Sequence, residues 1–349
     1  MFPDWVYQQC PEISATHRAA AFAHQAQLTK PAGSLGRLEQ LACDLAGLQQ
    51  TEKPRAANVP IIIFAGDHGV VAQGVSAYPQ EVTVAMMANF AAGGAAISVL
   101  ARELGSSLEV VDAGTLAQSP MPGIVTDKPR HGSRDFSKEQ ALTPDEAAFA
   151  LECGERAVAR AGTPDLLIFG EMGIGNTTAS AAIAAALLGV GAERTAGSGT
   201  GVDAEGRALK ARVIDQALAL HGLAKPGASA ESILCAVGGL EIMAICGAII
   251  AAAQRRIPIL IDGFIVSAAA LAAVRLNPSC RAFLVASHRS AEQGHHLVLG
   301  ALNAQPLIDL DLRLGEGSGA AIALPLLRLA CALHNGMATF GEANVPDRA

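Results

Sequence analysis

Apolar residues recur at helical spacing through two segments near the start of the chain, residues 12–28 and 35–50, with "TKPAGS" (29–34) as the break between them. Apolar positions three and four residues apart line one side of a helix. A further apolar helical pattern covers residues 319–335. We therefore expect the two ends of the chain, residues 1–50 and 319–349, to pack together as a small helical domain.

The middle of the chain, residues 51–318, shows a different pattern: short aliphatic runs that end in polar or glycine residues alternate with helical stretches. Runs that are apolar on both faces and separated by helices are typical of a parallel sheet covered on both sides. The sequence predicts an α/β fold with a doubly wound, mainly parallel sheet in a large nucleotide-binding domain. The expected strands lie in VPIIIFAGDHG (59–69), LEVVDAG (108–114), DLLIFGE (165–171), IPILIDG (257–263), AFLVASH (282–288) and PLIDLD (306–311).

A polar stretch with several prolines and glycines, residues 115–142, is predicted to be a long loop. It ends at "TPDE" (143–146), where Thr143 can cap a helix, Pro144 suits the first helical position and Glu146 can complete a capping box. This is a structural signal, and it carries no chemistry.

Composition narrows the function. Charged residues make up 16% of the chain and the net charge is −7, with no cluster of Lys or Arg, so a nucleic-acid partner is not expected. The seven cysteines include no Cys-x-x-Cys pair, which indicates reduced core cysteines in a cytoplasmic protein and no metal site.

Two stretches bear on the location of the protein. The first residues, "MFPDWVYQQC", carry neither a basic region nor a long apolar core, so no signal peptide is expected. The apolar run 233–253 has the length of a membrane span but contains Glu241. An unpaired acid is costly inside a bilayer, so we expect buried globular helices and no membrane span.

Polar side chains follow most of the predicted strands. In a doubly wound sheet, ligands bind outside the carboxyl ends of the strands, so these residues form one candidate set. Each alone could also be a strand-end cap or a loop ion pair. The set is Asp67, His68, Asp112, Glu171, Asp262, Ser287, His288, Asp309 and Asp311.

Two glycine-rich segments suggest a phosphorylated ligand. In "GEMGIGNTTAS" (170–180), Gly173 and Gly175 permit close backbone approach, and the first N–H groups of the following helix, with Asn176 and Thr177, can donate to an anion. The second segment, "GSGTGVD" (197–203), precedes a helix that carries Lys210. Flexible glycine turns remain the alternative for each segment taken alone.

Two familiar nucleotide sites fit poorly. "GIGNTT" lacks the last glycine of Gly-x-Gly-x-x-Gly, which argues against a nicotinamide-dependent dehydrogenase, and the Walker pattern of nucleoside triphosphatases is absent. Near the end of the chain, "LRLGEGSGAA" (312–321) places Glu316 between glycines just before a long apolar helix. Glycines here allow something to approach the carboxylate closely, although a solvated turn would also explain them.

Six segments together resemble one known family, nicotinate-nucleotide:dimethylbenzimidazole phosphoribosyltransferase. They occur in the expected order over nearly the whole chain. One departure is Val84, at a position where some members are expected to carry a glutamine that faces the base. The segments are KPAGSLGRLE (30–39), FAGDHGV (64–70), GVSAYPQEVT (74–83), GEMGIGNTT (170–178), SHRSAEQGH (287–295) and LGEGSGA (314–320).

The resemblance implies a homodimeric enzyme that needs no cofactor and no metal. Its reaction moves the 5-phosphoribosyl group from nicotinate mononucleotide to 5,6-dimethylbenzimidazole and gives α-ribazole 5′-phosphate and nicotinate, in the assembly of the nucleotide loop of cobalamin. A non-catalytic protein that binds a nucleotide or a corrinoid on the same fold is the alternative, and turnover of nicotinate mononucleotide distinguishes the two.

The resemblance also implies residue roles. A carboxylate such as Glu171 would favour the positive charge that develops at C1′ of the ribose, and Glu316 would be the base that takes the N–H proton of the incoming imidazole. Phosphate and ribose would contact Gly173, Gly175, Asn176, Thr177, Ser198, Gly199, Thr200, Gly201 and Lys210. Ser76, Tyr78, Met172 and Leu314 would line the base pocket, and Asp262 and Ser290 would contact ribose or nicotinate.

Overall fold

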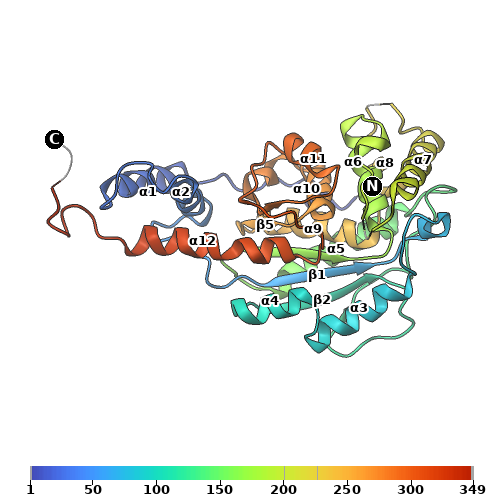
Figure 1. Ribbon diagram of the computed structural model, residues 1–349, viewed down its shortest axis with the longest axis horizontal. Helices are drawn as coiled ribbons and strands as arrows, with labels where there is room; N and C mark the ends of the chain where they lie inside the picture. The colour runs from blue at the N-terminus through green and yellow to red at the C-terminus, as the bar shows by residue number, and fades with distance from the viewer. Residues whose placement is uncertain (1, 200, 226, 347–349) are drawn as a thin grey trace.

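A six-stranded parallel sheet forms the centre of the molecule, in a computed structural model that describes residues 2–199, 201–225 and 227–346 (Figure 1). The strand order is β3-β2-β1-β4-β5-β6, and every neighbouring pair is parallel. This is the order of a doubly wound nucleotide-binding sheet, so the predicted fold class is confirmed. The strands are β1 (Ile61–Gly66), β2 (Leu108–Gly114), β3 (Val125–Thr126), β4 (Leu167–Met172), β5 (Ile259–Ile261) and β6 (Leu284–Ala286).

Helices connect the strands and cover the sheet on both faces (Figure 1). A capping box begins α5 as predicted, because Thr143 accepts from the Glu146 backbone and the Glu146 side chain accepts from the Thr143 backbone. The helices are α1 (Ala15–Gln27), α2 (Arg37–Gln49), α3 (Glu81–Ala92), α4 (Ala96–Leu104), α5 (Pro144–Arg160), α6 (Asn176–Leu188), α7 (Ala204–Leu220), α8 (Ala230–Val237), α9 (Leu240–Gln254), α10 (Phe264–Leu276), α11 (His295–Ala301) and α12 (Ser318–Gly336).

Glycines and alanines let helices and strands pack closely. Helices α5 and α9 cross where Gly154 lies against the backbone of Ala244 and Gly247 lies against that of Leu151, and a Cβ on either glycine would collide with its neighbour. On β1, Gly66 faces the side chain of Glu241 at the start of α9. Helix α9 therefore packs closely against both α5 and one face of the sheet.

The helices from the two chain ends lie together beside the sheet (Figure 1). Near the end of α12, His334 receives a hydrogen bond on its ring from Gln25 at 2.8 Å, and its carbonyl oxygen lies 2.9 Å from the ring of His24. Residues 5–8 contact a different part of the chain: the Gln254 side chain, at the end of α9, donates to the Trp5 carbonyl oxygen at 2.6 Å. Of the first 50 residues, α1 and α2 are therefore the part that packs with α12.

Two details of the predicted sheet are wrong. The segment PLIDLD gives β8 (Ile308–Asp309), which pairs only with β7 (His288–Arg289) in a separate two-stranded sheet. Asp311 has φ +54°, which turns the chain away from an extended course soon after β8. The remaining strand of the main sheet, β3, comes from within the predicted loop 115–142 and pairs with β2 at Val111 and Asp112.

The apolar run 233–253 forms the buried helices α8 and α9, as predicted. Another stretch, Glu81–Leu104, is long and apolar enough to cross a membrane by length and composition alone. It is interrupted by Gly93, whose φ of +83° ends α3 before α4 begins. All seven cysteines are buried and free.

Candidate active site

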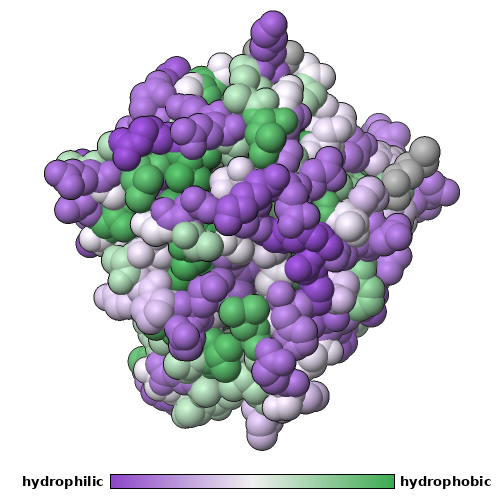
Figure 2. Space-filling model, turned by 90° about the vertical axis from the view of Figure 1, so that its right-hand side faces the viewer, coloured by the Kyte–Doolittle hydropathy of each residue, from purple (hydrophilic) through white to green (hydrophobic). Residues whose placement is uncertain are grey.

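One cavity of about 700 Å³ opens at the carboxyl end of the sheet, beside β4 and β5. The end of the molecule that carries α3, α6 and α7 is shown in Figure 2, where apolar patches are separated by polar side chains. The cavity is lined by Tyr78, Val82, Met86, Glu171, Met172, Gly173, Ile174, Asn176, Thr177, Gly199, Asp262, Gly263, Phe264, Ile265, Val266, His288, Ser290, Glu292, Asp311, Leu312, Arg313, Leu314, Gly315 and Glu316.

The turn that carries Glu316 has an uncommon backbone. Gly315, Glu316 and Gly317 have φ values of +87°, +62° and +76°, and the middle residue has a steric strain that glycine would not have. The turn lies on the face of β4 marked by Gly170, where a side chain would collide with the Glu316 backbone. The flanking glycines thus bring a buried carboxylate, 6% exposed, against the end of the sheet.

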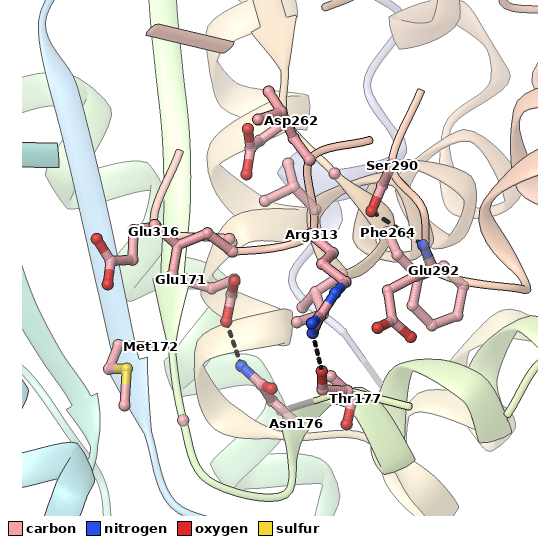
Figure 3. Close-up of a pocket in the computed structure, with 18 of the residues that line it drawn as sticks. Glu171, Met172, Asn176, Thr177, Asp262, Phe264, Ser290, Glu292, Arg313 and Glu316 are labelled. Carbon is pink, nitrogen blue, oxygen red and sulfur yellow. Dashed lines mark hydrogen bonds between the residues drawn. The ribbon is translucent and has the colours of Figure 1, made fainter. Parts of the chain in front are cut away.

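Glu171 lies at the end of β4 and points to a different side of that strand from Glu316 (Figure 3). Asn176, at the start of α6, donates a hydrogen bond to its carboxylate. Burial raises the pKa of Glu171 to about 8, the carboxylates of Asp262 and Glu241 add to the shift, and the Asn176 bond opposes it. A carboxyl group with this pKa is mainly protonated at neutral pH.

Burial also raises the pKa of Glu316; the Ile97 backbone N–H at the start of α4 opposes this shift, and the charge of Asp262 adds to it. One carboxylate oxygen of Glu316, Oε2, is buried and has no hydrogen-bond partner among the described residues. A buried, unpaired carboxylate oxygen with a raised pKa is a group that can accept a proton.

Polar backbone and side-chain groups gather at the α6 end of the cavity. Gly175, with φ +98°, precedes α6, so the first turn of this helix begins at the cavity wall with Asn176 and Thr177. The Lys210 ammonium donates to Thr177 Oγ1 at 2.8 Å, and burial lowers the pKa of Lys210 to about 8 while Glu292 opposes the shift. A helix N-terminus beside a lysine suits an anionic group.

Arg313 was missed by the sequence analysis, although it lies just before the glycine turn. Its guanidinium reaches the same end of the cavity and donates to the Gly199 carbonyl oxygen at 3.4 Å (Figure 3). Glu292 was also missed, and burial raises its pKa while Lys210 opposes the shift. The signal that could have identified Arg313 was its position in the stretch LRLGEGSGAA (312–321), close to Glu316.

The opposite end of the cavity is apolar. Val82 and Met86, one turn apart on α3, face it together with Met172, Tyr78 and Leu314. Tyr78 and Leu314 are 51% and 60% exposed, so this end of the cavity is open. Val84 is not among the lining residues, because a position two residues from Val82 points to another side of the helix.

The structure brings thirteen of the predicted site residues to the cavity and leaves others outside its wall. Those at the wall are Tyr78, Glu171, Met172, Gly173, Asn176, Thr177, Gly199, Asp262, His288, Ser290, Asp311, Leu314 and Glu316. Lys210 lies behind Thr177, and the Ser76 hydroxyl donates to the Tyr78 carbonyl oxygen at 3.0 Å. Gly175, Ser198 and Gly201 do not line the cavity, and Thr200 lies outside the described residues.

Several strand-end residues have structural partners. Asp112 pairs with Lys128 at 2.7 Å, Asp67 accepts from the Leu116 backbone at 2.9 Å, and the His68 ring lies 2.7 Å from Glu241. Glu241, the acid within the apolar run 233–253, therefore has His68 as its partner. Among the described residues, no group of three or more His, Cys, Asp or Glu side chains is arranged to hold a metal ion.

A doubly wound sheet with a cavity at the carboxyl ends of its strands, polar at one end and apolar at the other, is typical of the nucleotide-binding α/β class of enzymes. A family model described as Phosphoribosyltransferase matches residues 10–345. The chain belongs to the nicotinate-nucleotide–dimethylbenzimidazole phosphoribosyltransferase family, as the following relatives show.

The curated protein of that name from Bradyrhizobium diazoefficiens is 80% identical over 350 residues, covering 100% of this chain and 99% of the relative. The protein of the same name from Pseudomonas aeruginosa is 55% identical over 347 residues, covering 99% and 98%. A crystal structure of the enzyme from Thermus thermophilus has a TM-score of 0.90 at 43% identity and covers 96% of this chain and 100% of that one.

Proposed function

We propose that the chain transfers the 5-phosphoribosyl group from nicotinate mononucleotide to a ring nitrogen of 5,6-dimethylbenzimidazole, with nicotinate and α-ribazole 5′-phosphate as products. Membership of the family supports this activity. The single observation that carries the assignment is the pair of buried carboxylates, Glu171 and Glu316, on two sides of β4 in one cavity.

The chemistry of the donor fits the groups at hand. The glycosidic nitrogen of nicotinate mononucleotide is a quaternary pyridinium, so nicotinate leaves as a neutral ring nitrogen and needs no general acid. Positive charge develops at C1′ as this bond breaks. An ionised Glu171 beside the bound ribose stabilises that charge, and neither a metal ion nor a cofactor takes part.

The acceptor must lose its N–H proton as its other ring nitrogen bonds to C1′. Glu316 accepts this proton, because its free oxygen is buried beside the apolar end of the cavity. The proton becomes acidic only as the new bond forms, so the base acts in the transition state. Tyr78, Met172 and Leu314 form the wall against which the flat base lies, and Ser76 supports Tyr78 through its backbone.

The phosphoribosyl group occupies the α6 end of the cavity. The side chains of Asn176 and Thr177, at the start of α6, donate to phosphate or ribose oxygens, and Arg313 adds a guanidinium. Lys210 acts through Thr177 from behind the wall. Gly173 and Gly199, at the cavity wall, permit close approach, and Ser290 offers a hydroxyl to the ribose.

We also propose that the enzyme is a homodimer. Helix α12 exposes an apolar stripe of Ile322, Pro325, Leu329 and Ala332, and α4, which packs against α12, exposes Val99. Exposed fractions of 54% for Leu329 and 39% for Val99 on two adjoining helices are typical of a surface that a second copy covers. The free, buried cysteines suit a cytoplasmic enzyme.

Direct assay tests the function. Purified protein is incubated with nicotinate mononucleotide and, separately, with 5,6-dimethylbenzimidazole, other benzimidazoles, purines and phenols, and products are identified by mass. We expect α-ribazole 5′-phosphate and one equivalent of nicotinate. Binding of the nucleotide without nicotinate release with any base would instead identify a non-catalytic nucleotide-binding protein.

A further inference from the structure

Helix α12, which follows the Glu316 turn, begins without a cap of its own. Its N-cap residue is Gly317, which has no side chain to accept from the free N–H groups of the first turn. The acceptor comes from another part of the chain: Asp262 Oδ1, at the end of β5, accepts from the Ala320 backbone at 2.9 Å. Asp262 is 2% exposed, so this bond is shielded from water.

The same bond fixes the turn that carries Glu316. Both the backbone N–H and the hydroxyl of Ser318 donate to the Gly315 carbonyl oxygen, at 3.0 and 2.6 Å. The turn and the first turn of α12 are therefore one closed unit, and Asp262 attaches this unit to the end of β5. Gly319 lies tightly against the His288 ring, which leaves the unit little room to shift.

Asp262 also acts on Glu316 through its charge. Its carboxylate raises the pKa of Glu316 and that of Glu171, in each case in addition to burial. The His288 ring also faces Asp262, with Nδ1 3.8 Å from Asp262 Oδ1, and the Ile97 backbone N–H faces Glu316. Glu171 is faced by the charge of Glu241 on α9, the Asn176 side chain and the Glu316 backbone N–H. Burial lowers the pKa of His288, and the charges of Asp262 and Asp309 oppose that shift. Burial raises the pKa of Asp262, and the charge of His288 opposes that shift.

We propose that Asp262 is a positioning residue for Glu316: it holds the Gly315–Gly317 turn in place through the first turn of α12, and its negative charge favours transfer of the acceptor's proton to Glu316. This inference rests on the proposed function of Glu316 as the base. It differs from the expectation that Asp262 contacts ribose or nicotinate.

Two substitutions separate position from charge. Asp262→Asn keeps an oxygen that can accept from Ala320 but removes the charge, whereas Asp262→Ala removes both. For Asp262→Asn we expect KM for both substrates within about twofold of wild type. We also expect the acid limb of the kcat–pH profile to be displaced to lower pH, because both Glu316 and Glu171 lose a proton more readily without the Asp262 charge. For Asp262→Ala we expect kcat to fall about 10²-fold, the size of effect that a misplacement of about 1 Å produces.

A matched control is Asp112→Asn. Asp112 is also a buried aspartate at a strand end, but it pairs with Lys128 and does not line the cavity. Its loss should lower thermal stability and leave the acid limb of the kcat–pH profile where it is in wild type. Hydrogen exchange supplies a readout that needs no activity: amides of residues 315–322 should exchange faster in Asp262→Ala and not in Asp112→Asn.

The outcomes are distinct. A tenfold or larger rise in KM for nicotinate mononucleotide in Asp262→Asn, with an unmoved acid limb, would make Asp262 a substrate ligand and overturn the proposal. Unchanged exchange at residues 315–322 in Asp262→Ala would overturn the positional part. An inactive wild-type protein in the same assay would contradict the proposed function instead, while the exchange experiment would still test the link between Asp262 and the turn.

Discussion

The backbone of Glu316 passes directly over Gly170 on β4: a Cβ at residue 170 would lie 2.5 Å from the Glu316 carbonyl carbon and 2.5 Å from Ile63 Cδ1. Neither neighbour is the end of a flexible surface chain, so neither can move aside easily. Gly170 is therefore the position on the sheet that admits the second carboxylate. Glu171, the next residue, supplies the first carboxylate on the other side of the strand.

Gly170→Ala should displace the Glu316 turn while the cavity residues themselves remain. Overpacking of a closed core costs about 1–3 kcal/mol, and misplacement of the base should lower kcat by about 10²-fold. Thermal unfolding and steady-state kinetics measure the two effects. Gly300→Ala is the control, because Gly300 lies in α11 with open space at its Cβ, so its stability and kcat should be close to wild type. Normal turnover in a folded Gly170→Ala protein would contradict the argument.

The pH dependence of kcat/KM should report Glu171. The pKa of this group is raised to about 8 in the free enzyme, so its ionised fraction grows as the pH rises toward that value, and kcat/KM should rise with it. Glu171→Gln should remove this rise of kcat/KM with pH and leave the pH dependence that is due to Glu316. It should also slow the cleavage of nicotinate mononucleotide to nicotinate in the absence of an acceptor. A Glu171→Gln profile with the wild-type limb intact would assign the limb to another group.

Lys210 and Arg313, the cations at the α6 end of the cavity, should contribute mainly to binding of the nucleotide. Lys210→Ala should raise KM for nicotinate mononucleotide with a smaller effect on kcat, since an interaction made equally in the ground and transition states changes only KM. Because Lys210 lies behind Thr177, we expect Arg313→Ala to raise KM more, Arg313 being at the cavity wall. A collapse of kcat with unchanged nucleotide affinity in Lys210→Ala would show that its role is in the chemical step.

Features that depend on residues close together in the sequence could be predicted, whereas features that depend on contacts between distant residues could not. The strand at 108–114 and the capping box at Thr143 were predicted because aliphatic runs and caps are local signals. Strand β3 was missed because its two residues carry no pattern of their own and are held by pairing with β2. For the site, Glu316 was identified from its flanking glycines, whereas the approach to Gly170 joins residues far apart in the chain, and no local pattern records such a contact.

The proposed dimer surface can be tested without the substrates. Leu329→Glu places a charge on the apolar stripe of α12, where Leu329 is 54% exposed in the isolated chain. In a monomer this change should leave stability nearly unaltered, but in a dimer it buries an unpaired charge at the interface. We expect dimer in wild type and monomer in the variant by light scattering. Leu220→Glu is the control, because Leu220 is 57% exposed at the end of α7, away from the stripe, and the variant should stay dimeric. A wild-type protein that is monomeric at micromolar concentration would end the proposal.

Glu316→Gln is the sharpest test of the site, because it keeps the shape and polarity of the side chain and removes the basic oxygen. Loss of a general base costs about 10²–10⁴-fold in turnover, so kcat should fall by that factor while affinity for the base changes little. The variant can adopt the φ of +62° at this position as well as glutamate does, so it should fold normally. Acceptor-free cleavage of nicotinate mononucleotide should be largely retained, in contrast to Glu171→Gln, because that side reaction needs charge stabilisation at C1′ and no proton from an imidazole. Near-normal turnover in folded Glu316→Gln protein would reduce Glu316 to a turn residue and leave the proton of the acceptor to another group.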